Sequence, residues 1–407
     1  MCALLLAPLL ALPAFLLGVL VWVILEHFLT TDVPPVLQHR LKFRFLHCMF
    51  LYVVTLGNIN EKLGICSMAK FFRFFQDCMI IRNDPKLVVT NLRYGTVPVR
   101  LFQPKAASFR PRRGVIFYHG GGGILGSLDA YHSLCSFLAR ETDSVVLSVG
   151  YRMYPDYHSP TMIQDCINAC IHFLKSLNTY GVDSKRVLVC GESVGGLAVA
   201  LISQFLLNRS DLPRIRAQIL IYPFFQAINL QLPSFQQSQN IPFLTRKFMI
   251  SCLCNCASID PSWQDAIVNG SYIPPKMWKK YQKWLSADNI PQEFKKNYRS
   301  LVPSPFNEAA YLEAQILLDV KYSPLIAEDE IFAQLPEAFL LSCENDILRD
   351  DTLLYKKRLE DQGVPVTWYH IEDGFHGSMI LFDKKPFSFP CSLKLMNALV
   401  CYINGIQ

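Results

Sequence analysis

Residues 186–204 read RVLVCGESVGGLAVALISQ, and they carry the clearest signal of the fold. It opens with an apolar run typical of a strand, passes through the pattern G-x-S-x-G at residues 191–195, and continues as an apolar run typical of a helix. A serine on such a strand-to-helix turn is held above the edge of the sheet with its Oγ exposed. The start of the helix directs free N–H groups and a partial positive charge at the same point. The pattern therefore favours Ser193 as a nucleophile over a purely structural turn.

Strands and helices alternate on both sides of this stretch. Short apolar runs predict the strands Leu87–Asn91, Val99–Phe102, Gly114–Tyr118, Val145–Val149, Val187–Cys190, Ile219–Tyr222, Ala338–Ser342 and Val366–Ile371. Helices are predicted from Ser159, as N-cap before Pro160, to Leu177, and then over Val194–Leu207, Asp350–Glu360 and Leu393–Ile403. This alternation indicates an α/β fold with a mostly parallel sheet covered by helices on both faces. It stops between Gln226 and Pro336, where we expect a mainly helical insertion.

A glycine run, His119-Gly120-Gly121-Gly122-Gly123, directly follows one predicted strand. Acyl transfer creates a negatively charged oxygen in its transition state, and fixed main-chain N–H groups stabilise that oxygen without reorganisation. Glycines let such N–H groups turn toward it without a side-chain clash. A phosphate-binding loop would continue with Lys and Ser or Thr, whereas Ile and Leu follow here. We therefore expect an oxyanion hole built from Gly120, Gly121, Gly122 and Val194.

A nucleophilic serine needs a base, and the base needs a carboxylate that orients it, in the chain order serine, acid, histidine. Only His370 and His376 follow Ser193. We favour His376, because His370 lies inside a predicted strand whereas glycines on both sides of His376 suit a loop tip. Asp346, just past a predicted strand, is favoured as the acid. The competing carboxylates are Glu344, Asp373, and Asp350 with Asp351, the last two read as caps of the next helix.

The composition limits the classes of function. Of 407 residues, 51 % are hydrophobic and 18 % are charged, and the net charge is +6. A chain this apolar is not disordered, and without a basic run it has no nucleic-acid footprint. Cys252-x-Cys254-x-Cys256 matches no zinc spacing and has no histidine pair nearby. We expect no metal, no organic cofactor and no nucleic-acid partner, and no pattern identifies a protein partner.

The first 25 residues contain no ionisable side chain. A span of the bilayer takes about 20 apolar residues, so this run is long enough. We favour a retained anchor over a cleaved signal peptide or a buried helix, because no basic flank or cleavage site is evident. Basic residues at positions 40, 42 and 44 favour a cytosolic catalytic side, whereas sequons at Asn208 and Asn269 matter only in a lumen. The residues alone leave the orientation open.

Five ordered motifs resemble the arylacetamide deacetylase-like proteins of the hormone-sensitive-lipase branch of the α/β-hydrolases. They are YHGGGG (118–123), YRMYPDYHSP (151–160), GESVGG (191–196), ENDILRD (344–350) and DGFHG (373–377). The resemblance implies an α/β-hydrolase fold and an esterase of endoplasmic-reticulum type, anchored as a type II membrane protein with a lumenal catalytic domain. Relatives usually carry an aromatic residue where this chain has Gly123, and Ala-Pro-Glu where it has Tyr154-Pro155-Asp156. The first departure changes a wall of the pocket and therefore bears on substrate specificity.

The resemblance also implies a helical cap made of two segments. The predicted division is a signal-anchor helix over 1–26, an N-terminal cap segment over 27–86, a first core part over 87–226, a cap insertion over 227–335 and a second core part over 336–407.

Two functions follow from these observations. The first is a hydrolase of carboxylic esters or amides of apolar, lipid-like substrates, which works through Ser193, His376 and Asp346 and an acyl-enzyme. The second is a binding protein on a hydrolase scaffold that holds a small apolar ligand without turnover. We favour the enzyme because neither the serine nor the histidine of the predicted triad is missing.

Overall fold

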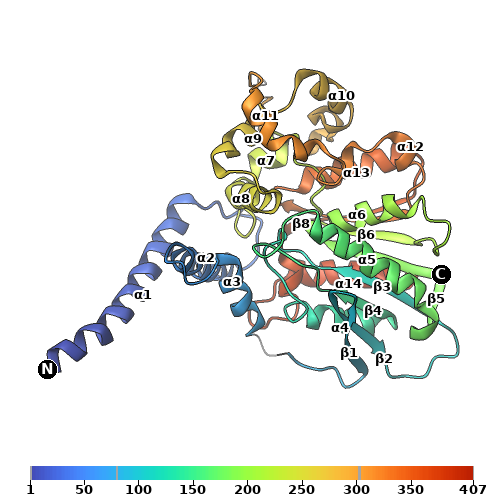
Figure 1. The fold of residues 1–407 in the computed structure, drawn as a ribbon, viewed down its shortest axis with the longest axis horizontal. Helices are drawn as coiled ribbons and strands as arrows, with labels where there is room; N and C mark the ends of the chain where they lie inside the picture. Colours follow the sequence, from blue (N-terminus) through green and yellow to red (C-terminus); the bar gives the residue numbers. More distant parts are fainter. Residues whose placement is uncertain (1, 79–80, 301–303, 407) are drawn as a thin grey trace.

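The computed structural model describes residues 2–78, 81–300 and 304–406. Its centre is an eight-stranded sheet with the order β1-β2-β4-β3-β5-β6-β7-β8 (Figure 1). The strands are β1 (Leu87–Tyr94), β2 (Val97–Pro104), β3 (Arg112–Tyr118), β4 (Val145–Val149), β5 (Val182–Glu192), β6 (Ala217–Ile221), β7 (Glu337–Asn345) and β8 (Val366–Phe375). β2 pairs antiparallel with β1 and with β4, and the remaining pairs are parallel. The predicted mostly parallel sheet is confirmed, and each predicted strand overlaps one of these eight.

The described residues form the helices given next, some of which cover the two faces of the sheet. They are α1 (Cys2–Thr30), α2 (Arg40–Lys62), α3 (Met68–Asp77), α4 (His132–Thr142), α5 (Thr161–Lys175), α6 (Val194–Leu206), α7 (Pro233–Gln237), α8 (Arg246–Ala257), α9 (Gln264–Asn269), α10 (Pro275–Leu285), α11 (Glu308–Ala314), α12 (Asp329–Phe332), α13 (Arg349–Asp361) and α14 (Pro390–Gly405). α5, α6 and α13 share one hydrophobic core with the sheet, and α4 and α14 share the other (Figure 1). Strands enclosed in this way, such as β4, are buried along their whole length, which is why they are apolar without alternation.

The start of α5 differs from the prediction. The sequence suggests Ser159 as N-cap and Pro160 as first helical residue, but the helix begins at Thr161, with Pro160 in the N-cap position and no side-chain cap. The Ser159 N–H instead donates to the Cys256 carbonyl at 3.0 Å. The approach to α5 is therefore held by α8, a contact that local sequence does not reveal.

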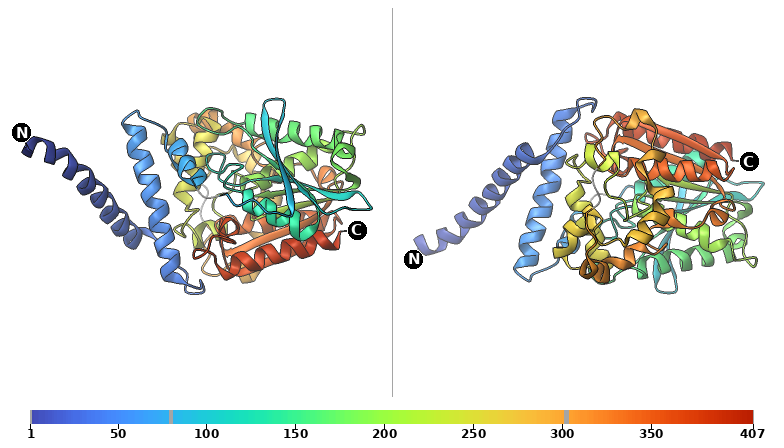
Figure 2. Two further views of the ribbon diagram at one scale, coloured as in Figure 1. Left: turned by 90° about the horizontal axis from the view of Figure 1, so that it is seen from below. Right: turned by 90° about the horizontal axis from the view of Figure 1, so that it is seen from above.

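The N-terminal helices stand apart from the sheet. α1 projects from the body, and α2 lies between α1 and the body (Figure 2). Among the described residues, α1 is the one helix long and apolar enough to cross a membrane, over Ala11–Thr30 with a mean hydropathy of 2.1. Its last turns pack on α2, where the Nδ1 atoms of His27 and His47 lie 2.8 Å apart. α2 thus connects the exposed apolar helix to the body.

Helices α7 to α12 form a further layer above α6 and α13 in Figure 1. α8 reaches α2 at the side of this layer, since the rings of Phe50 and Phe248 lie 5.7 Å apart. The space enclosed by α2, α3, α8 and the carboxyl ends of the central strands holds the site described next.

Candidate active site

Ser193 occupies the turn between β5 and α6 in a strained conformation. Its φ is 54° and its ψ is −119°, a combination that L-residues rarely adopt. The chain folds back so closely that a Cβ on Gly191 would lie 2.1 Å from the Gly195 carbonyl oxygen, and a Cβ on Gly195 would lie 2.1 Å from that of Tyr118. The Ser193 N–H donates to the Ile221 carbonyl at 2.9 Å, which fixes the turn to β6. Both glycines are therefore steric requirements of the turn.

His376 and Asp346 reach Ser193 from two other strand ends. The Nε2 atom of His376 lies 2.9 Å from the Ser193 Oγ, and its Nδ1 lies 2.8 Å from Oδ2 of Asp346. The Leu348 N–H donates to Oδ1 of Asp346 at 2.8 Å, so both carboxylate oxygens have a donor. All three side chains are buried. The structure brings together the three residues that the sequence analysis selected, in an arrangement suited to passing a proton from the hydroxyl to the imidazole.

The competing residues lie elsewhere. His370 lies within β8, between the Ser342 hydroxyl at 2.8 Å and Glu344 at 3.2 Å. Asp373 lies in β8, which runs four residues past the predicted strand end at Ile371, and its carboxylate accepts from Lys394 at 2.9 Å.

The expectation that Asp350 and Asp351 cap the next helix is wrong. They lie inside the first turn of α13, whose N-cap is Leu348 with no side-chain cap. Their carboxylates accept instead from the backbone N–H groups of Ser234 at 2.7 Å and Phe225 at 2.8 Å. They therefore hold the chain that follows β6.

The glycine run forms a loop beside Ser193. Gly121 and Gly122 have φ of 104° and 64° and line the cavity with Val194, whereas Gly120 packs against Glu192 behind it. The Gly121 carbonyl accepts from Leu125 at 2.8 Å and the Gly122 carbonyl from the Cys256 thiol at 3.2 Å. Within residues 81–300 no hydrogen bond uses the N–H of Gly121 or Gly122. Since both carbonyls already accept hydrogen bonds, the N–H groups of Gly121 and Gly122 are the groups of this loop that can donate beside Ser193, next to the N-terminus of α6.

His119, at the start of this loop, is fixed by packing against two tyrosine rings. Its ring stacks between Tyr131 at 5.4 Å and Tyr151 at 4.3 Å, and the Tyr151 hydroxyl donates to the His119 carbonyl at 2.7 Å. Burial lowers the pKa of His119 to about 4, so its imidazole is neutral. Its position fits a packing residue of the loop.

Two residues that support His376 were not predicted from the sequence, Tyr222 and Glu192. The Tyr222 hydroxyl donates to Glu192 at 2.6 Å and accepts the Met379 N–H at 3.1 Å, while its ring lies 4.9 Å from that of His376. Burial raises the pKa of Glu192. Tyr222 follows a strand without any local motif, so only Glu192, through its place beside the serine, could have been singled out.

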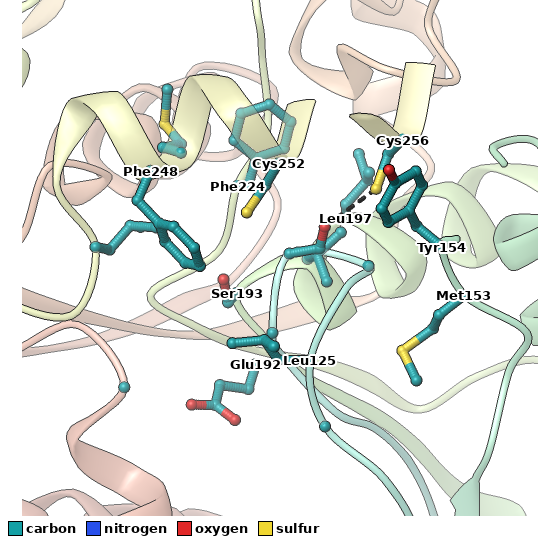
Figure 3. A pocket seen from close by; sticks show the side chains of 18 of the residues that line it. Leu125, Met153, Tyr154, Glu192, Ser193, Leu197, Phe224, Phe248, Cys252 and Cys256 are labelled. Atoms are coloured by element: carbon teal, nitrogen blue, oxygen red, sulfur yellow. Dashed lines mark hydrogen bonds between the residues drawn. The ribbon is translucent and has the colours of Figure 1, made fainter. Parts of the chain in front are cut away.

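A cavity of about 330 Å³ opens over Ser193 and His376. Its walls are mostly apolar and come from four parts of the chain: Phe50, Phe72, Leu125, Met153, Met162, Leu197, Phe224, Phe243, Phe248, Met249, Leu253 and Ile380 are among the residues that line it. Figure 3 shows Phe248, Cys252 and Cys256 of α8 around the space near Ser193. A volume of this size with few polar groups suits the apolar part of a small molecule.

The cysteine cluster of α8 is divided between two environments. Cys252 and Cys256, four residues apart, line the cavity, whereas Cys254 is buried in the hydrophobic core. No group of three His, Cys, Asp or Glu side chains gathers in a way that could hold a metal ion within residues 2–78, 81–300 and 304–406.

Comparisons with known proteins show the family and the fold. The family model described as alpha/beta hydrolase fold matches residues 115–280 and 292–380. The chain is 70 % identical over 399 residues to Arylacetamide deacetylase-like 4 of Homo sapiens, with 98 % of each chain covered. It is 33 % identical over 392 residues to Neutral cholesterol ester hydrolase 1 of Mus musculus, covering 93 % of this chain and 95 % of that relative. A solved thermostable esterase from Pseudomonas putida has a TM-score of 0.64 at 21 % identity, covering 92 % of this chain and 99 % of the esterase, which supports the fold alone.

Proposed function

The chain belongs to the α/β-hydrolases, among the arylacetamide deacetylase-like proteins, and from this premise we propose that it is a serine hydrolase of carboxylic esters. One observation carries the proposal: the Ser193 hydroxyl, the His376 imidazole and the Asp346 carboxylate are linked by contacts of 2.9 and 2.8 Å at the base of an apolar cavity.

The mechanism follows from this arrangement. His376 takes the proton of Ser193, whose Oγ attacks the carbonyl carbon, and Asp346 keeps the imidazole in the required tautomer. The N–H groups of Gly121, Gly122 and Val194 stabilise the oxyanion, while Gly120 serves the packing of the loop. His376 then protonates the leaving group, and water attacks the acyl-enzyme in the second half of the cycle. Every step uses groups of the chain itself and water.

The substrate class is an apolar carboxylic ester, with amides of similar shape included. The apolar walls of the cavity support this assignment, because an acyl chain or an aryl group loses its contact with water there. The names of two relatives point the same way, since one is a cholesterol ester hydrolase and the other is likened to a deacetylase of arylacetamides.

In this proposal the cap of the site consists of two segments, residues 27–86 and 227–335. The core consists of residues 87–226 and 336–407. The contacts at the cavity support this division. α2 and α3 contribute Phe50 and Phe72 to its wall, and α8 contributes Phe248.

The proposed location is the endoplasmic-reticulum membrane, with α1 as a type II anchor and the body in the lumen. The exposed apolar helix α1 supports an anchor, since only 17 % of its most apolar stretch is buried. Asn208 and Asn269 are both exposed, as acceptors of a lumenal glycan must be.

The proposal is tested by labelling the full-length protein in membranes with a fluorophosphonate probe, which bonds covalently to an activated serine. The parent should be labelled, and Ser193→Ala should lose all labelling. Ser203→Ala is the matched control. Ser203 is buried in α6, the helix that follows Ser193, and its Oγ donates to the Val199 carbonyl at 2.8 Å. A well-folded parent that stays unlabelled would instead favour the ligand-binding alternative.

A further inference from the structure

α2 is apolar on two opposite faces. On one side Phe43 is buried against Phe243 and Phe375 of the body, and His47 is buried between Phe243 and His27 of α1. On the other side Leu41, Phe45 and Met49, spaced four residues apart along one face, are 85, 55 and 46 % exposed, and the Phe45 ring stacks on Phe387 at the edge of this face at 6.1 Å. A surface helix of a globular protein normally has polar residues on its outer face, so an apolar outer face indicates a second apolar surrounding.

α3 repeats this pattern. Ala69 is buried, and Phe72 and Gln76 line the cavity. On its other side Phe74 and Phe75 pack edge to face at 5.8 Å and are 65 and 45 % exposed. Leu63 and Ile65 in the connection to α2 are both 68 % exposed. We call these exposed residues, Leu41, Phe45, Met49, Leu63, Ile65, Phe74 and Phe75, the outer apolar surface.

We infer that the outer apolar surface docks on the lipid bilayer, so that α2 and α3 lie in the membrane interface next to α1. This inference rests on the anchoring role proposed for α1. α2 and α3 lie on the side of the body from which α1 projects (Figures 1 and 2). α1 is fixed to α2 by the contact of His27 with His47 and by Arg44, whose Nη1 lies 3.0 Å from His27. A bilayer crossed by α1 therefore meets α2 first.

The charges of this region favour lipid over a second protein. Arg40 and Lys62, at the two ends of α2, are exposed, and basic groups beside an apolar helix face attract anionic headgroups. An isolated apolar surface of this kind is rare on a monomeric soluble protein.

Membrane docking would also place the bilayer close to the active site, because the inner side of α3 contacts the loop that follows the glycine run. The Arg73 guanidinium donates to the carbonyls of Ile124 and Tyr154, both at 2.8 Å, and Gln76 accepts the Gly126 N–H at 2.9 Å. One layer of helices thus separates the bilayer from the cavity, so an apolar ester dissolved in the membrane has a short path to Ser193.

The test is photo-crosslinking of the full-length protein in phosphatidylcholine vesicles that contain phosphatidylserine. p-Benzoylphenylalanine replaces, one at a time, Leu41, Phe74, Trp22 and Phe109. Trp22 of α1 is 63 % exposed and reports the anchor, and Phe109 is a fully exposed residue of the β2–β3 connection that serves as the water-facing control. We expect lipid adducts at Leu41 and Phe74 on the order of tenfold above those at Phe109, because interfacial side chains touch acyl chains.

Three results would overturn the inference, and each has a different meaning. Lipid adducts at Trp22 but only background levels at Leu41 and Phe74 would leave the anchor standing and reject the docking. Adducts of Leu41 and Phe74 with a second copy of the chain would assign the surface to a protein contact. Background levels at Trp22 as well would reject the anchor itself. None of these readouts depends on hydrolase activity, so a failure of the proposed reaction would be seen separately.

Discussion

The Gly122 carbonyl shows how a single distant side chain shapes the loop beside Ser193. The Cys256 thiol donates to it at 3.2 Å, and the same sulfur would lie 2.9 Å from a Cβ placed on Gly123. A larger residue at position 123, such as the aromatic residue that the resemblance leads us to expect there, has no room while Cys256 stays where it is. The glycine and the cysteine therefore form one steric unit. This gives a physical reason for the departure from the family pattern.

Cys256→Ala should lower kcat for a short-chain ester by about fivefold, since a lost hydrogen bond costs on the order of 1 kcal/mol. KM should change little, because the change acts on the position of the oxyanion donors. Cys256→Ser keeps a donor and should retain most of the activity. Cys254→Ala, a core cysteine on the same helix, is the control and should leave kcat intact. Equal losses in Cys256→Ala and Cys256→Ser would contradict this role.

Tyr222→Phe should lower both stability and kcat. The substitution removes the donor to the buried Glu192 carboxyl and the acceptor of the Met379 N–H, so about 1–3 kcal/mol of unfolding free energy should be lost. Since the Tyr222 ring lies against His376, the rate should fall as well. Tyr355→Phe breaks a comparable buried bond, to Gln218 at 2.9 Å, away from the cavity. Denaturant unfolding and initial rates of both variants check this; a Tyr222→Phe variant that is less stable but fully active would show that the tyrosine is structural only.

At the scale of elements, α13 is joined to the chain after β6 by two buried carboxylates. Asp351 accepts the Phe225 N–H at 2.8 Å and the Gln226 side-chain amide at 2.9 Å. These contacts tie the helix that follows Asp346 to the strand next to β5, which carries Ser193. The spacing between the acid and the nucleophile therefore depends on contacts between elements far apart in sequence.

Burial raises the pKa of Asp351 to about 7, which makes stability depend on pH. The folded state keeps this proton over a range where the unfolded chain, with an ordinary carboxyl pKa near 4, has released it. The contribution of Asp351 to the free energy of unfolding should therefore fall as pH rises from about 4 to about 7, and level off above that. Urea unfolding of the parent and of Asp351→Asn across this window measures the difference. Parallel curves for the two proteins would show that Asp351 titrates normally.

At the scale of the whole molecule, the helices α2, α3 and α8 and the carboxyl ends of the central strands line one cavity. α2 packs against α1 and, together with α3, lines the cavity, so apolar side chains extend from α1 to the cavity over Ser193. The location of the body follows from the topology of α1 and can be tested on the intact chain.

If the body lies in a lumen, the protein should carry glycans at Asn208 and Asn269. Both side chains are exposed, and Asn269 lies at the end of α9, where its Oδ1 accepts the Ser271 N–H at 2.9 Å. Asn208→Gln and Asn269→Gln should each remove one glycosidase-sensitive mobility step, and the double variant should remove both. The protein should also remain in the membrane pellet after alkaline carbonate. An unshifted parent, with an engineered sequon on a known lumenal reporter still modified, would contradict the lumenal orientation.

Much of the fold could be predicted because its signals are local. Strands buried on both faces must be apolar without alternation, and Gly191 and Gly195 must lack side chains for β5 to turn into α6, so these patterns are visible in the sequence. Ser193, His376 and Asp346 could be named because each follows a strand whose carboxyl end reaches the same edge of the sheet. The start of α5 and the roles of Asp350 and Asp351 were predicted wrongly, because their partners, α8 and the chain after β6, lie about 100 residues away.

The sheet, the turn at Ser193, the glycine loop and the apolar N-terminal run could be predicted from the amino-acid sequence, since each depends on neighbours in the chain. The side chains that support the site, Tyr222 behind His376 and Cys256 and Arg73 around the loop, became visible in the packed structure, as did the exposed face of α2. Such contacts join residues from separate elements, and no local preference specifies them. The contacts of Cys256 and Arg73 form when the helices of the N-terminal segment and of the later insertion pack against the sheet and its helices.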